Sequence, residues 1–488
     1  MTALCLFFLL ILRIFALFAV PPHPDEIVQI LMTDDIAHLK NFPLYFYGQT
    51  FMGPLESYLL APFVRIFGSY YLRVRVWNEL FYLGMVFLFV RTVKRLFDRE
   101  LSGYVLFFLS VAPFAVLFFT TVVGYGEVLL LAILSLVFLL KVSESNEKSP
   151  RYAFILGILS GLAFWCNPIY VIWLVPLGVS LIGLIPSSWK KMIPFWFGAG
   201  FLAGLFPAWI YAFQAGRPML IHTAGTQFTP FNKLPQSAYL FFARLKYFLT
   251  TSFFEKDSLV RKLIMGPALF VFGVFLVSFG SFLVSFLGNF KKHSVQEKIF
   301  HLFILLPPFI LAGLYISRDL NWDEGIRYFL PLMISYAFVM AWWIKRLKPV
   351  FLRHGLVTVL GGIMVLSSLA SLKMENRRRL DLVEIFQFLQ KNQLQFGVGD
   401  LNSAYGMNAL SHGQIQVTPA LYEVRYASLW KTVMEKGPQF FIFEQVDHRY
   451  KSRLAFDPHL KKATAGRRDI YYGPSELLRE IAETKEPL

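Results

Sequence analysis

Hydrophobic residues are grouped into long runs along this chain, and short charged or Pro/Gly-rich segments separate the runs. A helix needs about 20 apolar residues to cross the hydrocarbon core of a bilayer. Eleven runs approach that length, at residues 2–20, 72–91, 101–120, 125–141, 152–167, 168–186, 192–213, 263–288, 299–316, 327–344 and 352–371. The pattern therefore predicts an all-α polytopic membrane protein with about 11 transmembrane helices.

The pattern changes after about residue 371, where shorter elements follow one another. It predicts an amphipathic helix, a buried strand, a second helix and a second strand at 381–391, Gln395–Gly399, Ser428–Lys436 and Pro438–Glu444. Alternating helices and strands are typical of a small α/β domain. We therefore expect a transmembrane domain at 1–371 and a soluble α/β domain at 372–488.

Charge distribution predicts how the chain crosses the membrane. Basic residues cluster in loops on one side, at 91–99, 141–151, 190–191, 291–292 and 345–348, whereas the short loops at 121–124 and around 167 carry none. Such loops face the cytoplasm. An odd number of spans then places the α/β domain on the far, extracytoplasmic side, together with the longer loops 21–71, 214–262 and 317–326.

Composition narrows the function classes. Hydrophobic residues make up 56% of the 488 residues, which is too apolar for an ordinary soluble protein. The formal net charge is +16, and the basic residues that produce it cluster at the ends of the apolar runs. This distribution favours contact with membrane lipids and excludes nucleic acid as the partner. The two cysteines, Cys5 and Cys166, lie in apolar runs and support neither a disulfide framework nor a cysteine metal site.

Carboxylates gather in the first far-side loop, which has amphipathic patterns at 24–39 and Ser57–Phe67 that predict helices along the membrane surface. They are Asp25, Glu26, Asp34, Asp35 and Glu56. The first two follow Pro24 and suit the first turn of a helix, where negative charge is stabilised. The cluster equally suits a general base, a site for a divalent cation (Mg²⁺ or Mn²⁺), or a proton relay in a transporter. Spacing alone leaves these alternatives open.

Further candidates lie at the far-side ends of other runs. Arg327 and Tyr328 open a late span, where an arginine can pair with a phosphate or anchor the helix at the interface. Glu127 begins another span, where a helix-start acid is the simpler interpretation. Other polar candidates on the far side are His23, Tyr47, His222, Lys246 and the stretch Trp322-Asp323-Glu324. A lone histidine is seldom a metal ligand, so no metal site is assigned.

These residues resemble a known family. The acidic pair Asp25-Glu26 follows the first span, and the stretch Asn41–Phe67 comes later in the same loop. The motif Arg327-Tyr328-Phe329-Leu330-Pro331 opens a late span. In this order and topology the chain resembles the membrane-embedded GT-C glycosyltransferases, more narrowly the bacterial enzymes related to protein O-mannosyltransferases and to the lipid A aminoarabinose transferase (family 39/83-like). The resemblance covers roughly residues 1–371 and, beyond that, only the position of the last domain.

The resemblance implies a function. Family members transfer a sugar from a polyprenyl-phosphate donor on the outer side of the cytoplasmic membrane, usually with inversion, to a glycan, lipid or protein acceptor. It implies Asp25 as the base with Glu26 beside it, and Arg327 and Tyr328 as contacts of the lipid-linked phosphate. The family often has His-Pro-Pro where this chain has Met52-Gly53-Pro54, which leaves Glu56 as a third candidate catalytic residue. His23, Asp34, Asp35, Tyr47 and Glu127 complete the expected substrate-binding set.

The alternative function is a polytopic transporter or flippase for a lipid-linked or anionic solute. Transporters typically have broken or charged spans near the midplane and repeated halves. No repeated halves are visible in this sequence, and its polar residues crowd the far side, which favours the glycosyltransferase.

Overall fold

The computed structural model describes residues 2–49, 51–68, 71–113, 115–117, 124–145, 149–185, 192–216, 231–250, 259–317, 325–419, 426–443 and 453–483. Several sequence-based expectations lie outside the described residues: His222, Trp322, Asp323, Glu324 and the side chain of Lys246.

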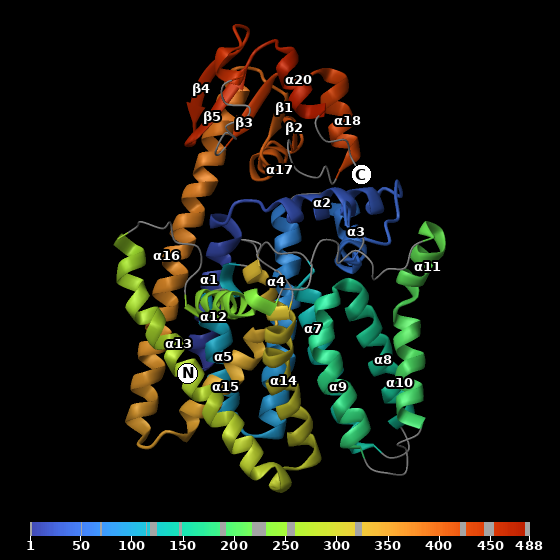
Figure 1. Cartoon of the computed structure of the whole chain (residues 1–488), viewed down its shortest axis with the longest axis vertical. Coiled ribbons are helices and arrows are strands. Elements are labelled where there is room, and N and C mark those ends of the chain that lie inside the picture. Colours follow the sequence, from blue (N-terminus) through green and yellow to red (C-terminus); the bar gives the residue numbers. More distant parts are fainter. Residues whose placement is uncertain are drawn as a thin grey trace.

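A helical bundle forms the lower part of the molecule (Figure 1). Its elements are α1 (Thr2–Ala19), α4 (Tyr71–Leu96), α5 (Arg99–Val111), α7 (Gly126–Glu144), α8 (Ser149–Cys166), η1 (Pro168–Tyr170), α9 (Val171–Gly183), α10 (Met192–Gly204), α11 (Phe206–Ala215), α12 (Leu234–Thr250), α13 (Leu259–Asn289), α14 (Val295–Ser317), α15 (Leu332–Arg346) and α16 (Val350–Lys391). Each predicted apolar run contains a helix. The segment expected as the loop 214–262 contains one as well, α12, which lies across the bundle in Figure 1.

Five of the described helices are long and apolar enough to cross a membrane, or six if the bent pair α10 and α11 is one span. The protein is thus an integral membrane protein by composition and fold, but the expected number of 11 spans is not confirmed. Helices α5, α9 and α15 have only 13, 13 and 15 residues. Apolar runs in the sequence continue past helix ends, so their length overstates the helix length.

Helices α8 and α10 pack with their backbones in direct contact. Glycines one turn apart face each other, Gly157 and Gly161 on α8 and Gly200 and Gly204 on α10. A Cβ atom at Gly161 would lie 2.3 Å from the Phe201 carbonyl oxygen, and one at Gly200 would lie 2.1 Å from the Phe154 carbonyl oxygen. Small residues at such spacing are how helices associate closely in lipid, where dispersion rather than water exclusion holds them together.

A buried ion pair connects the first helix to its neighbours. Arg13 Nη1 lies 2.5 Å from Glu79 Oε2 on α4, and its Nη2 donates to the Ala115 carbonyl oxygen at 3.0 Å. The guanidinium also stacks 3.5 Å from the centre of the Tyr82 ring. Charges are costly at this depth, so their mutual pairing explains how two charged residues occur within apolar helices.

The basic ends of the helices meet at one end of the bundle. Arg95 at the end of α4 lies 2.7 Å from Glu144 at the end of α7, and Gln296 on α14 donates to the same carboxylate at 3.2 Å. Lys345 on α15 pairs with Asp98. The loops that the sequence placed on one side of the membrane therefore contact each other.

Two further helices lie between the bundle and the C-terminal part: α2 (Pro24–Ala37) and α3 (Leu55–Phe67). Helix α3 is amphipathic as expected, with Glu56, Leu60 and Val64 buried and Phe63 and Ile66 exposed. Helix α2 differs from the expected surface helix, because twelve of its 14 residues are buried. The C-terminal part covers the face that an interfacial helix would expose.

The C-terminal part is a five-stranded sheet in the order β2-β1-β3-β5-β4. Its elements are β1 (Phe396–Gly399), α17 (Leu401–Leu410), β2 (Gln416–Pro419), α18 (Ala427–Lys436), β3 (Phe440–Phe443), β4 (Lys461–Ala465), β5 (Arg468–Tyr472) and α20 (Glu476–Glu483). Strand β1 is parallel to β2 and β3, whereas β5 is antiparallel to β3 and β4. Helix α16 runs without a break from the bundle to this sheet (Figure 1), so it crosses the expected domain boundary at 371.

Candidate active site

The start of helix α2 is fixed by its own side chains. His23 is the N-cap, and its Nδ1 accepts a hydrogen bond from the Asp25 backbone N–H at 3.2 Å. The Glu26 carboxylate accepts one from the His23 backbone N–H at 3.2 Å, which completes a capping box. Pro24 supplies the φ angle of the first turn. His23 is therefore a capping residue, a role that the sequence analysis did not assign to it, and the cap holds Asp25 in place.

Asp25 forms an ion pair with Arg327. The Arg327 Nη1 donates to Asp25 Oδ2 at 2.9 Å, although 302 positions separate the two residues in the chain. Arg327 lies in the short helix η6 (Gly325–Phe329), with its guanidinium 5.7 Å from the centre of the Tyr328 ring. Tyr125 interacts electrostatically with both members of the pair and hydrogen-bonds to Asn167. A carboxylate and an arginine thus meet at the membrane-facing side of α2.

Glu26 is held by a different arginine. Arg75 on α4 binds it as a fork, with Nε 2.6 Å from Oε1 and Nη2 2.9 Å from Oε2. The same guanidinium donates to the carbonyl oxygens of Leu17, Val20 and Pro21 at 2.8, 2.8 and 3.0 Å. Both side chains of the fork are fully buried. Arg75 therefore ties the end of α1 to the start of α2.

Glu56 and Glu127 form a second carboxyl pair. Glu56 lies near the start of α3 and Glu127 near the start of α7, and both are 2% exposed. Burial raises the pKa of the Glu56 carboxyl well above its ordinary value, and the Glu127 carboxylate raises it further, whereas the Gln29 amide and the Gly124 backbone lower it. Two carboxyls this close resist ionising together.

Asp34, Asp35 and Tyr47 lie elsewhere on the first loop. Asp35 Oδ2 accepts a hydrogen bond from the Tyr47 hydroxyl at 2.9 Å, and the Tyr426 hydroxyl lies 3.4 Å from both of its oxygens. Asp34 is closer to solvent and lies 3.4 Å from Lys40 Nζ. The Asp35–Tyr47–Tyr426 cluster joins the first loop to the C-terminal part, which is a structural role. Substrate binding by these residues stays a prediction.

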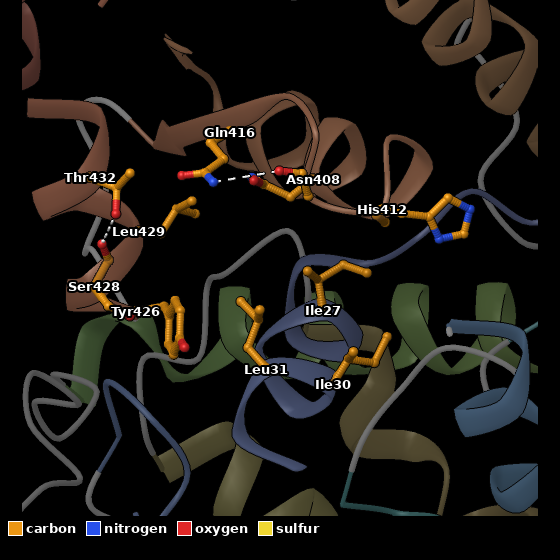
Figure 2. A pocket seen from close by; sticks show the side chains of 12 residues that line it. Ile27, Ile30, Leu31, Asn408, His412, Gln416, Tyr426, Ser428, Leu429 and Thr432 are labelled. Carbon is orange, nitrogen blue, oxygen red and sulfur yellow. Dashed lines mark hydrogen bonds between the residues drawn. The ribbon is translucent and has the colours of Figure 1, made fainter. Parts of the chain in front are cut away.

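A cleft of about 440 Å³ separates α2 from the C-terminal part. Figure 2 shows Ile27, Ile30 and Leu31 of α2 on one side and Gln416 and Leu429 on the other. None of the described residues that line it is an Asp, Glu, Lys or Arg. Asp25 precedes Ile27 by two residues, about 200° around the helix, so the carboxylate and the cleft lie on different faces of α2.

The structure adds residues that the sequence reasoning missed. Arg75 was inside the predicted span 72–91, where an arginine beside Arg73 and Glu79 is an unusual feature for a membrane helix. This unusual charge could have identified Arg75 as a candidate site residue from the sequence. Gln29 and Asn167 gave none, since isolated amides have no distinctive pattern, and only the packing of α2 against the bundle brings them to the site.

The comparisons with known proteins agree with these observations. Residues 52–211 match the family model of the dolichyl-phosphate-mannose-protein mannosyltransferases. No curated protein matches the chain. Among solved structures, ArnT from Cupriavidus metallidurans in the apo state superposes with a TM-score of 0.63 at 12% identity, covering 97% of this chain and 98% of that chain. The same protein bound to undecaprenyl phosphate gives a TM-score of 0.65 at the same identity and coverage.

The fold and the partial family match describe a helical membrane protein that is structurally similar to ArnT. Over nearly its whole length the chain has the fold of ArnT, and within 52–211 it matches the protein mannosyltransferase model. The resemblance stated from the sequence is therefore confirmed.

Proposed function

We propose that this protein is an inverting glycosyltransferase that moves a hexosyl or pentosyl group from a polyprenyl-phosphate donor to an acceptor hydroxyl or amine. The observation that carries the proposal is the Asp25–Arg327 pair at 2.9 Å. An inverting transfer needs a base on the acceptor and a positive group on the leaving phosphate. The pair supplies both at one point of the membrane-proximal layer.

Each residue then has a role in the transfer. Asp25 takes the proton of the acceptor as the acceptor atom bonds to the anomeric carbon of the sugar. The bond from that carbon to the phosphate oxygen breaks, and the phosphate leaves with the electron pair. Arg327 stabilises the developing charge on the phosphate, with Tyr328 beside it.

Glu26 and His23 are proposed as positioning residues. Both Glu26 oxygens accept hydrogen bonds from Arg75, so we do not assign this carboxylate as the base. Together with the His23 cap it fixes the first turn of α2, and so the position of Asp25. A shift of a fraction of an ångström in the position of a catalytic group lowers the reaction rate. The catalytic carboxylate therefore needs such support.

Orientation and domain organisation follow from the charges. We propose that the end of the bundle with the basic loops faces the cytoplasm of a bacterium. The site, on the opposite end, and the α/β domain at 372–488 are then extracytoplasmic, with 1–371 as the catalytic domain. The cleft beneath the α/β domain is proposed to hold an uncharged part of the acceptor, because its described lining carries no acidic or basic group apart from His412.

Transfer of labelled sugar from polyprenyl-phosphate donors in proteoliposomes tests the proposal. Asp25→Asn and Arg327→Ala should each lower the transfer rate by about 100-fold or more. Glu480→Gln, an exposed carboxylate paired with Arg453 on the outer surface, is the matched control and should transfer normally. Wild-type transfer by both site variants would refute the assignment, and solute uptake without transfer would support the transporter.

A further inference from the structure

Among the residues that the structure describes, buried acidic side chains are paired with a cation, with two exceptions. Seven are buried among the described residues: Asp25, Glu26, Asp35, Glu56, Glu79, Glu127 and Glu375. Five of them have a Lys or Arg nitrogen within 4 Å, namely Arg327, Arg75, Lys40, Arg13 and Arg378. Glu56 and Glu127 have no such partner in the described part of the chain, and instead they face each other. No described basic side chain therefore compensates these two carboxyls when they ionise.

Unsatisfied oxygen atoms converge on this pair. Three oxygen atoms, Glu56 Oε1, Glu127 Oε2 and Gln29 Oε1, are buried and make no hydrogen bond to a described residue, and the neighbouring Gln29 Nε2 makes none either. Gln29 is 0% exposed and its amide lies against Glu56. Buried polar atoms without partners are rare and call for an explanation such as a bound ion or water. These three atoms come from α2, α3 and α7, so only the folded chain assembles them.

We propose that Glu56, Glu127 and the Gln29 side-chain oxygen bind one divalent cation of the Mg²⁺ or Mn²⁺ type. All three ligands are hard oxygen donors, which these cations prefer, and Mg²⁺ is commonly held by one or two carboxylates with water completing the shell. Two carboxylates balance the two positive charges. The site thus resolves both the missing charge and the unpaired oxygens.

The position of the site gives the cation a task, which rests on the proposed function. Gln29 follows Asp25 by four residues on α2, so their Cβ atoms are about 6 Å apart on one face of the helix. A cation held by Gln29 therefore lies next to the Asp25–Arg327 pair. There its positive charge would add to that of Arg327 in stabilising the departing phosphate.

Direct measurement of Mn²⁺ binding tests the inference without using activity. Purified full-length protein, stripped with EDTA, is titrated with Mn²⁺ and free ion is followed by electron paramagnetic resonance. The wild type should bind one Mn²⁺, and Glu56→Gln, Glu127→Gln and Gln29→Leu should each weaken binding by at least about tenfold. Glu480→Gln, an exposed carboxylate of the C-terminal part paired with Arg453, should bind as the wild type does. Size-exclusion profiles identify any variant that fails to fold, and the others carry the comparison.

Two results would overturn the site: no Mn²⁺ bound by the wild type, or wild-type affinity in the folded variants. The first would mean that the two carboxyls share a proton instead. The sugar-transfer assay on the same preparations separates this inference from the proposed function. Transfer without Mn²⁺ binding refutes only the cation site, whereas Mn²⁺ binding that is lost in the variants supports the site even if no transfer occurs.

Discussion

Loss of Arg75 should destabilise this protein sharply. It makes five hydrogen bonds, two to Glu26 and three to the carbonyl oxygens of Leu17, Val20 and Pro21. Arg75→Met would leave a fully buried carboxylate without its partner and three carbonyls without donors. Breaking a buried ion pair in this way costs about 3–5 kcal/mol of unfolding free energy.

Glu26→Gln should be milder, and the asymmetry is the sharper test. In that variant the Arg75 guanidinium keeps its three carbonyl acceptors, so its charge remains solvated by the protein. We expect a loss of about 1–3 kcal/mol, typical for a weakened buried hydrogen bond. The double variant should lose less than the sum of the two single losses, because the two residues act as one unit.

The measurement is unfolding of the detergent-solubilised protein across a series of SDS mole fractions, followed by tryptophan fluorescence. Arg453→Met is the matched control, since Arg453 pairs with Glu480 at 2.6 Å but both side chains are about half exposed. Its effect should be too small to resolve in this assay, because solvent screens an exposed pair. The reasoning would be refuted if Arg75→Met were as stable as Arg453→Met, or if Glu26→Gln lost more stability than Arg75→Met.

Three further predictions follow from other contacts. Gly161→Leu should lower the unfolding midpoint and the yield of folded protein, because its Cβ would meet the Phe201 carbonyl oxygen at 2.3 Å, whereas Gly198→Ala, with no atom within 4 Å, should behave as the wild type in the same assay. The pKa of Glu56 in the folded protein is raised above its ordinary 4.5, so ionisation of this carboxyl destabilises the fold as pH rises. In EDTA, the unfolding midpoint of Glu56→Gln minus that of the wild type should therefore increase between pH 5 and pH 8. A difference that stays constant over this range would contradict the prediction. Asp35→Asn should loosen the C-terminal part, seen as faster hydrogen exchange in α18, and an unchanged exchange rate would show that the Tyr426 contact is dispensable.

Much of the architecture was predictable because it depends on local pattern. Each apolar run of the sequence contains a helix in the structure. The predicted alternation of short helices and strands after residue 371 correctly included strands β1 and β3 and helix α18. Strands β2, β4 and β5 were missed, because they are only four or five residues long, include polar or charged residues, and gain their strand character by pairing with neighbours. The burial of α2 was also missed, because an amphipathic pattern does not reveal that a second layer covers its outer face.

The sequence by itself determined that this chain is a membrane protein and that the basic ends of its helices lie on one side. It also determined that Asp25 and Glu26 follow the first helix. These are properties of neighbouring residues. Only the tertiary structure decided their partners: Arg327 for Asp25, Arg75 for Glu26, and Glu127 for Glu56. The physical reason is that ion pairs form between side chains brought together by helix packing, across up to 302 positions of chain, and no local periodicity encodes such a distance.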